Sequence, residues 1–290
     1  MNPLVYHCVS GHSFFTGVAL LMLAAVVSVR PKPAIKRVPT FAFLAGATAV
    51  ALSSTPIPYW FCVTAGLVTG AWLVSRNKKP WGAQTAYAMV AVWFLAAALE
   101  APYHIGPAIQ PAIERKLTVI GDSVTAGVGG DEKSERWPAI LARQHDLAVQ
   151  DISHMGETVA SALKRAQDHK IESQVVLLEI GGNDVLGATT VAEFERGLNR
   201  LLAHVTEHNR QVIMFELPLP PFFHEYGRVQ RTAAWKHGVR LVPKRVFLSV
   251  IAGSDSTLDT IHLSQPGHEL MASTVSVSYT HLTLPTTPYV

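Results

Sequence analysis

The first third of the chain is too apolar for an ordinary soluble domain, and this feature constrains the fold most strongly. Four apolar segments, at about 13–29, 41–55, 57–75 and 83–99, are each near the roughly 17–25 residues that a membrane helix needs, although the second is short. The residues between these segments are charged or rich in proline. The sequence therefore predicts an all-α transmembrane region of about four helices over residues 1–112.

The charged residues are distributed as unevenly as the apolar ones. The whole chain is 49% hydrophobic and 16% charged. Residues 1–113 carry seven Lys or Arg but a single acid, Glu100, which gives a net charge of +6, whereas the remainder of the chain has a net charge of −3. The basic pI of about 8.9 thus belongs to the first third. It does not indicate binding to nucleic acid.

The positive charges of the first third predict its orientation in a membrane. They lie in two connecting segments, RPKPAIKR (30–37) and RNKK (76–79), and the positive-inside rule places such segments in the cytoplasm. We therefore expect a multi-pass protein of the cytoplasmic (inner) membrane, with everything after Leu99 on the extracytoplasmic or periplasmic side. A re-entrant pair over 41–75 would leave this sidedness unchanged. A cleaved signal peptide is disfavoured because no positive charge precedes the first apolar segment.

Four residues of the first third could suggest a metal site or a disulfide. His7 and His12 lie five positions apart, a pattern that histidines at a membrane surface also produce by chance. Cys8 and Cys62 are the only cysteines, and neither has the spacing of a metal ligand. In the expected topology both cysteines lie toward the outer face, so a disulfide between them is conceivable.

After residue 113 the pattern changes to short β-branched runs that alternate with amphipathic stretches. The expected strands are KLTVIG (116–121), LAVQDI (147–152), QVVLLEI (174–180), QVIMFEL (211–217) and VRLV (239–242). The expected helices lie near 136–145, 158–169, 190–208 and 226–237, with a last one from Pro266. Such alternation implies crossover connections and a parallel sheet that is covered on both faces. The sequence predicts a flavodoxin-like three-layer α/β/α sandwich of about five parallel strands over residues 113–276.

In sheets of this kind, ligands bind beyond the carboxyl ends of the strands, and here those ends are polar. The first expected strand ends at Gly121, Asp122 and Ser123; the second runs into ISHMGET (152–158) and the third into GGND (181–184). A DTIH sequence (259–262) follows near the end of the chain. We expect these four segments to meet on one edge of the sheet.

The glycine-rich loop TVIGDSVTAGVGG (118–130) does not fit a phosphate-binding motif. A Walker loop needs a lysine after its glycines, and no lysine occurs before Lys133. The glycines also lack the G-x-G-x-x-G spacing of a dinucleotide site, and Ser123 is not in a G-x-S-x-G elbow. What remains is a serine at the end of a strand, in a turn of small residues.

A serine hydroxyl is a nucleophile when a base takes its proton and a third group orients that base. Asp259 and His262, three residues apart on a short turn, can supply an oriented imidazole. The D-x-x-H pattern is weak by itself, and its metal interpretation is weaker still. Acyl transfer also needs donors for the oxyanion, for which the N–H groups of Ser123 and Gly156 and the side-chain amide of Asn183 are candidates. Taken singly, Gly156 and Asn183 are ordinary turn residues.

The order of these segments resembles the SGNH (GDSL-type) hydrolase family of esterases, lipases and thioesterases over roughly residues 116–275. RWPAIL (136–141) and ELPLPPFF (216–223) further resemble its bacterial thioesterase/lysophospholipase branch. The resemblance implies that Ser123 is the nucleophile, Asp259 the orienting acid and His262 the base, with oxyanion donors on Ser123, Gly156 and Asn183. It implies a supporting role for Asp122, together with Gly121 and Gly182, in the loop. No metal or cofactor is implied.

Two features depart from the family pattern, and a third concerns the end of the chain. Ser153, His154 and Met155 stand where many relatives have an Asn before the glycine, and Thr260 stands where a Gly often follows the catalytic Asp. These departures concern the local loop shape, and with it the substrate preference, and neither removes a catalytic group. The run SYTHLTLPTTPYV (278–290) looks like translated adapter or vector sequence, or else a disordered Thr/Pro-rich tail, so residues 277–290 are expected to add nothing to function.

The sequence thus predicts a membrane-anchored serine ester hydrolase of the esterase, lipase or thioesterase type. Its expected partners are an ester-containing small molecule, lipid or acylated glycan as substrate, and the lipid bilayer, with no nucleic acid and no metal. An acyltransferase or acetyltransferase that acts on an envelope glycan or lipid is the alternative, because the same triad serves both reactions. A membrane-tethered binding module with an inert site is a third hypothesis, against which the complete Ser, Gly, Asn, Asp and His set argues.

Overall fold

The structure, a computed structural model, describes residues 1–29, 33–78, 80–110, 114–127, 135–259 and 261–283, with side chains to residue 276. Arg30, Lys32, Lys79 and Thr260 lie outside the described residues, as do the expected domain boundary at 112–113 and the end of the tail. The chain divides into two compact units. A helical unit comprises Asn2–Ile105 and Pro218–Arg228, and a sheet unit comprises Gly106–Leu217 and Val229–Val290.

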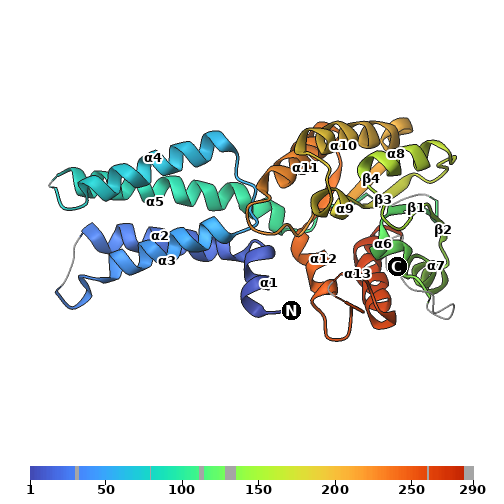
Figure 1. Cartoon of the computed structure of the whole chain (residues 1–290), viewed down its shortest axis with the longest axis horizontal. Coiled ribbons are helices and arrows are strands. Elements are labelled where there is room, and N and C mark those ends of the chain that lie inside the picture. Colours follow the sequence, from blue (N-terminus) through green and yellow to red (C-terminus); the bar gives the residue numbers. More distant parts are fainter. Residues whose placement is uncertain (30–32, 79, 111–113, 128–134, 260, 284–290) are drawn as a thin grey trace, which may run out of the picture. The chain divides into compact units, whose positions relative to one another are not determined.

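The helical unit contains the four expected apolar helices, preceded by a short helix that the sequence analysis did not predict (Figure 1). The helices are α1 (Pro3–Val9), α2 (His12–Val29), α3 (Val38–Leu52), α4 (Tyr59–Ser75) and α5 (Trp81–Glu100), with short 3₁₀ turns at Pro33–Ile35 and Ala101–His104. By length and composition, His12–Val29 and Trp81–His104 are long and apolar enough to cross a membrane. The helices α3 and α4 are apolar but shorter.

Small residues and a few polar contacts hold these helices together. A Cβ atom on Gly17 of α2 would lie 2.7 Å from the carbonyl oxygen of Gly46 in α3, so the two backbones approach closely only because both residues are glycines. The indole N–H of Trp72 donates to Ser28 Oγ at 3.0 Å, and that of Trp93 donates to Thr69 Oγ1 at 3.0 Å. Interhelical packing of this kind is typical of membrane helices.

The sheet unit has five parallel strands in the order β2-β1-β3-β4-β5, which confirms the predicted flavodoxin-like fold. The strands are β1 (Lys116–Gly121), β2 (Ala148–Asp151), β3 (Val175–Glu179), β4 (Gln211–Phe215) and β5 (Arg240–Val242). The helices of this unit are α6 (Ser123–Ala126), α7 (Trp137–His145), α8 (Val159–Gln167), α9 (Gly182–Leu186), α10 (Val191–Val205), α12 (Lys244–Ile251) and α13 (Gln265–Thr283). The helix α11 (His224–Lys236) begins in the segment assigned to the helical unit.

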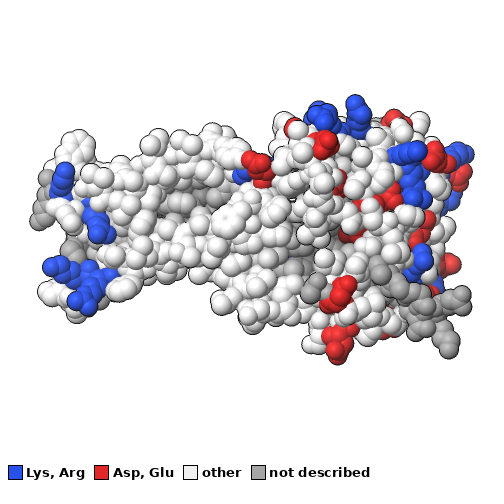
Figure 2. Space-filling model, in the orientation of Figure 1, with Lys and Arg blue, Asp and Glu red and all other residues white. Residues whose placement is uncertain are grey.

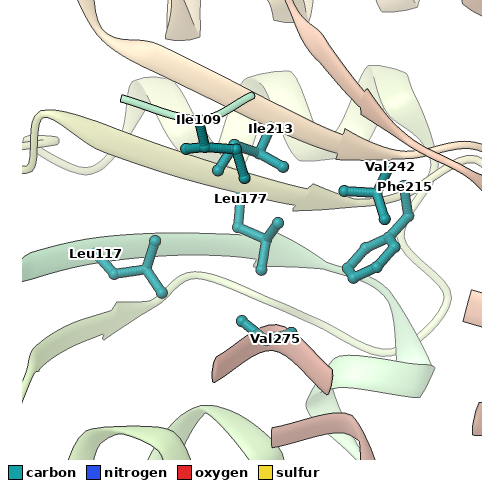
Figure 3. A pocket seen from close by; sticks show the side chains of 7 residues that line it. All are labelled: Ile109, Leu117, Leu177, Ile213, Phe215, Val242 and Val275. Atoms are coloured by element: carbon teal, nitrogen blue, oxygen red, sulfur yellow. The ribbon is translucent and has the colours of Figure 1, made fainter. Parts of the chain in front are cut away.

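The central strands β1, β3 and β4 bury the side chains on both of their sides. Both faces of the sheet are therefore covered by helices. The side chains of Leu117, Val119 and Leu177 pack in one core cluster with residues of α7 and α13. An apolar cavity of about 20 Å³ remains in this cluster, lined by aliphatic and aromatic side chains from the sheet, from α13 and from Ile109 (Figure 3). Its size and its apolar walls identify it as a packing gap and not as a ligand site.

The elements missed by the sequence analysis are mostly short. The helices α6 and α9 span only four and five residues, directly after β1 and β3, too few to show a periodic pattern. The helix α13 begins at Gln265, next to the expected start at Pro266, and continues to Thr283, beyond the expected end of the domain at residue 276. The sequence offers no Gly or Pro between Pro266 and Pro285 other than Gly267, so nothing in it stops the helical backbone earlier.

Candidate active site

The turn after β1 presents the serine at the carboxyl edge of the sheet. Ser123 is the first residue of α6, and Asp122 caps this helix by accepting the N–H of Val124 on its Oδ1 at 3.0 Å. The strand β3 lies next to β1, and the N–H of Asp122 donates to the carbonyl oxygen of Glu179 at 3.1 Å. The helix cap and the backbone hydrogen bond to β3, both made by Asp122, therefore fix the position of the neighbouring Ser123.

The structure brings His262 and Asp259 to this serine. The Nε2 atom of His262 lies 3.1 Å from Ser123 Oγ, and its Nδ1 atom lies 2.7 Å from Asp259 Oδ2. The three groups thus form a chain from hydroxyl to imidazole to carboxylate, which is the geometry of a serine nucleophile with an oriented base. Because the DTIH turn supplies both partners, the contact between them is local in the sequence.

The carboxylate of Asp259 is held in its charged form by its own turn. Its Oδ1 accepts the N–H groups of Ile261 at 2.7 Å and of His262 at 2.9 Å. These amides, foremost that of Ile261, and the contact with the His262 side chain keep the pKa of Asp259 well below its ordinary value. An ionised carboxylate on Nδ1 leaves Nε2 as the nitrogen that faces the serine.

The structure places Asn183 next to this turn. Asn183 lies in α9, after the GG pair that follows β3. Its Nδ2 donates to the carbonyl oxygen of Glu157 at 3.0 Å and makes a longer contact, 3.4 Å, with Asp122 Oδ2. One N–H of the amide is therefore firmly held, whereas the other makes only a weak interaction.

Gly156 and Gly182 occupy positions that favour glycine. Gly156 has a φ of +71° and no other atom close to its Cβ position, so the backbone turns there with its N–H unobstructed by a side chain. A Cβ atom on Gly182 would lie 3.2 Å from Asp122 Oδ2. The glycine thus allows α9 to approach the capping carboxylate.

Several buried polar residues around the site were not singled out from the sequence. Glu157 is buried, accepts Arg165 Nε at 3.1 Å and supplies the carbonyl oxygen that holds Asn183. Glu179 and Thr125 form a second buried contact beneath the serine turn. The signal for Glu179 was available, because it is the one charged residue in the otherwise apolar strand VVLLE.

The other histidines and the cysteines of interest have separate surroundings. His268 is buried, and its Nδ1 accepts the N–H of Trp137 at 3.4 Å. In the helical unit, His7 Nε2 lies 3.0 Å from Thr16 Oγ1, and the rings of His12 and His104 are 5.8 Å apart. Among the described residues, no group of three or more His, Cys, Asp or Glu has the arrangement of a metal site. The thiols of Cys8 and Cys62 are free.

Comparisons with known proteins identify the family of the sheet unit. The sequence profile of the GDSL-like Lipase/Acylhydrolase family matches residues 119–270, more than half of the chain. Esterase TesA of Pseudomonas aeruginosa is 29% identical over 167 residues, which are 53% of this chain and 82% of that protein. The thioesterase 1/protease 1/lysophospholipase L1 of Escherichia coli K12 is 32% identical over 116 residues, 39% of this chain and 54% of that protein.

Solved structures show the same fold. A crystal structure of TesA superposes with a TM-score of 0.50 at 26% identity and covers 58% of this chain and 99% of its own. The esterase EstA from Pseudoalteromonas has a TM-score of 0.51 at 22% identity, with 58% and 98% covered, and supports the fold alone. The chain therefore belongs to the GDSL-like Lipase/Acylhydrolase family, a family of carboxylic ester hydrolases.

Proposed function

We propose that this protein is a membrane-anchored serine ester hydrolase in which Ser123, His262 and Asp259 act as a catalytic triad. One observation carries the proposal: the imidazole of His262 lies 3.1 Å from Ser123 Oγ and 2.7 Å from the carboxylate of Asp259. An oriented base at hydrogen-bond distance is what converts a serine hydroxyl into a nucleophile.

In the proposed reaction, Ser123 Oγ attacks the acyl carbonyl carbon while His262 Nε2 takes the hydroxyl proton. The tetrahedral oxyanion is stabilised by the N–H groups of Ser123 and Gly156 and by the amide of Asn183. His262 then returns the proton to the departing alcohol or thiol, which leaves an acyl group on Ser123. A water molecule, deprotonated by His262, releases the acid and restores the hydroxyl.

The surface of the helical unit supports the membrane part of the proposal. The helices α2, α3 and α4 contain no Asp, Glu, Lys or Arg, and α5 contains only Glu100 at its end. Figure 2 shows uncharged sides along these helices, with Lys and Arg gathered at one end. Large exposed apolar side chains occur on each of the helices α2 to α5, among them Val26, Phe41, Leu67 and Phe94. An apolar outer surface of this kind is stable in a lipid bilayer and unfavourable in water.

The charges predict which side of the membrane each end of the helical unit faces. Lys36 and Arg37 precede α3, and Arg76 and Lys78 follow α4, so these connections are cytoplasmic by the positive-inside rule. The chain after α5 is then extracytoplasmic. We propose that residues 113–276 form the hydrolase domain on that side of the inner membrane.

A fluorophosphonate probe tests the proposal on the full-length chain in detergent or nanodiscs. We expect covalent labelling that is lost in Ser123→Ala and kept in the control Ser249→Ala, which changes an exposed serine of α12. Labelling that persists in Ser123→Ala would exclude Ser123 as the nucleophile. The names of the relatives, esterase and thioesterase/lysophospholipase, define the substrate panel: acetyl esters, long-chain esters, acyl thioesters and lysophospholipids. Product analysis with and without a sugar acceptor separates hydrolysis from acyl transfer.

A further inference from the structure

Glu179, the last residue of β3, lies beneath the turn that carries Ser123 and contacts it at two points. The residue is only 3% exposed. Its backbone oxygen accepts the N–H of Asp122 at 3.1 Å, and its Oε2 accepts the hydroxyl of Thr125 at 2.9 Å. Gly121 makes the second contact possible, since a Cβ atom there would lie 2.4 Å from Thr125 Oγ1. A carboxyl group in this position is not needed for packing, because the strand is otherwise aliphatic.

The carboxyl groups of Glu179 and Asp122 are in hydrogen-bond contact, and both are buried. Two adjacent carboxyl groups in a buried site share one proton, because a second negative charge there is strongly unfavourable. Burial and the neighbouring Asp122 raise the pKa of Glu179 well above its ordinary value. Burial also raises the pKa of Asp122, but the N–H of Val124, the Glu179 contact and nearby His262 favour its charged form. Because Asp122 Oδ1 accepts the N–H of Val124 at 3.0 Å, which stabilises its charged form, the shared proton is assigned to Glu179, which donates to the Asp122 carboxylate.

This arrangement bears directly on Asn183. Asp122 Oδ2 is an acceptor 3.4 Å from Asn183 Nδ2, so the carboxylate competes for the N–H that the oxyanion requires. A proton donated by Glu179 occupies part of the acceptor capacity of Asp122 and weakens that competition. The other N–H of Asn183 remains fixed on the Glu157 carbonyl oxygen at 3.0 Å.

We propose that Glu179 is a positioning residue for the acyl-transfer chemistry: its carboxyl O–H, donated to Asp122, fixes the serine turn and leaves one N–H of Asn183 available for the oxyanion. This inference rests on the proposed roles of Ser123 and Asn183. It assigns Glu179 no contact with the substrate.

The exchange Glu179→Gln tests the protonation state directly. A glutamine has the shape of a protonated glutamate, with an N–H to donate to Asp122 and an oxygen to accept from Thr125. We expect kcat on a soluble p-nitrophenyl ester to stay within about fivefold of the wild type, the scale of one altered neutral hydrogen bond. The exchange Glu179→Leu removes the donor, and we expect kcat to fall by about 10²-fold, as when an oxyanion donor is lost, with KM nearly unchanged.

A matched control is Glu216→Gln. Glu216 is another buried acid, one residue past β4, but it is paired with Arg231 Nε at 2.6 Å. We expect this exchange to lower the melting temperature and to leave the catalytic constants close to wild type. A Glu179→Gln variant as inactive as Glu179→Leu, or a Glu179→Leu variant as active as the wild type, would overturn the proposal.

If Glu179→Leu does not fold, the pH dependence of the stability of the wild type and of Glu179→Gln tests whether Glu179 is protonated. A group whose pKa is raised in the folded state contributes stability that is complete below its unfolded value and is lost as the pH rises through its folded value. The wild type should therefore lose stability relative to Glu179→Gln as the pH is raised above about 4.3, the ordinary glutamate value. A difference in Tm that is independent of pH would contradict a protonated Glu179. In contrast, a wild type without Ser123-dependent labelling would refute the proposed function itself.

Discussion

In the sheet unit the large apolar side chains are buried, whereas in the helical unit many of them are exposed. Leu117, Val119 and Leu177 of the sheet are almost inaccessible to water, but Leu67 of α4 is 71% exposed. The charged residues also differ between the two units. The sheet unit buries Asp122, Glu179 and other acids near one edge, whereas α2, α3 and α4 contain no Asp, Glu, Lys or Arg. The difference is the one that the proposed membrane anchoring predicts, with the sheet unit in water and the helical unit in lipid.

We expect the largest effect on activity from the loss of a charged side chain at the active site of the sheet unit. Asp259→Asn removes the ionised partner of His262, and we expect kcat/KM to fall by about 10⁴-fold at pH 7. Because the pKa of Asp259 is depressed, its contribution to stability is present above its ordinary value and is lost only as the pH falls through the lower folded value. Unfolding of the wild type and the variant should thus show the same pH dependence between about pH 5 and 8. A divergence in that range would mean that Asp259 titrates there.

The next effect concerns a neutral donor at the same edge of the sheet. Asn183→Ala removes an oxyanion donor, and we expect turnover to fall by roughly 10²–10³-fold without loss of the fold. Asn199→Ala is the control, because Asn199 lies on α10 and bonds to Glu195 and His237. Full activity of Asn183→Ala on a short p-nitrophenyl ester would show that the oxyanion assignment is wrong.

A charged side chain introduced on the outer surface of the helical unit tests whether that surface faces lipid or water. Leu67→Asp introduces a carboxylate at an exposed position in the middle of α4, and we expect a cost of about 2.5–3.5 kcal/mol if this surface faces lipid. Trp235→Asp changes a residue of the sheet unit that is 85% exposed, and an exchange on a surface that faces water costs about 0.5 kcal/mol or less. The measurement is the fraction of chain that resists carbonate extraction from membranes. Equal fractions for both variants would remove the distinction between the two surfaces.

We expect the smallest effect, a change in thermal stability, from glycine exchanges that compare a packed position between two helices with an open position. Gly17→Ala places a methyl group 2.7 Å from the Gly46 carbonyl oxygen, and overpacking of this kind costs about 1–3 kcal/mol. Gly70→Ala is the matched exchange, since nothing lies within 4 Å of its Cβ position. We expect thermal unfolding in detergent to occur at a lower temperature for Gly17→Ala than for Gly70→Ala. The reverse order would argue against the close approach of α2 and α3.

Much of the fold could be predicted from the sequence because its periodic signals are strong. The run KLTVIG is β1 without change, and the apolar runs of the first third became α2 to α5 within a few residues. Ser123 and Asn183 were singled out because each follows a strand in a recognisable motif, and Asp259 and His262 because they form a D-x-x-H pair near the end of the chain. Glu157 and Glu179 were passed over, because their roles depend on burial and on partners distant in the sequence, such as Thr125 and Asn183. A pattern along one chain does not report those distances.

The segment Pro218–Arg228 has a consequence for the order in which the chain folds. It follows β4 in the sequence, yet it belongs to the helical unit, where His224 Nε2 lies 2.6 Å from the Ser53 carbonyl oxygen and Arg228 donates to Ile57 at 3.1 Å. The Arg228 guanidinium also lies 3.8 Å from the centre of the Tyr59 ring. The partners of the two hydrogen bonds are 171 residues apart, so during synthesis the α3–α4 connection must wait until most of the sheet unit has been made. Closing so long a loop is slow, and the helical unit therefore reaches its final form only late in folding.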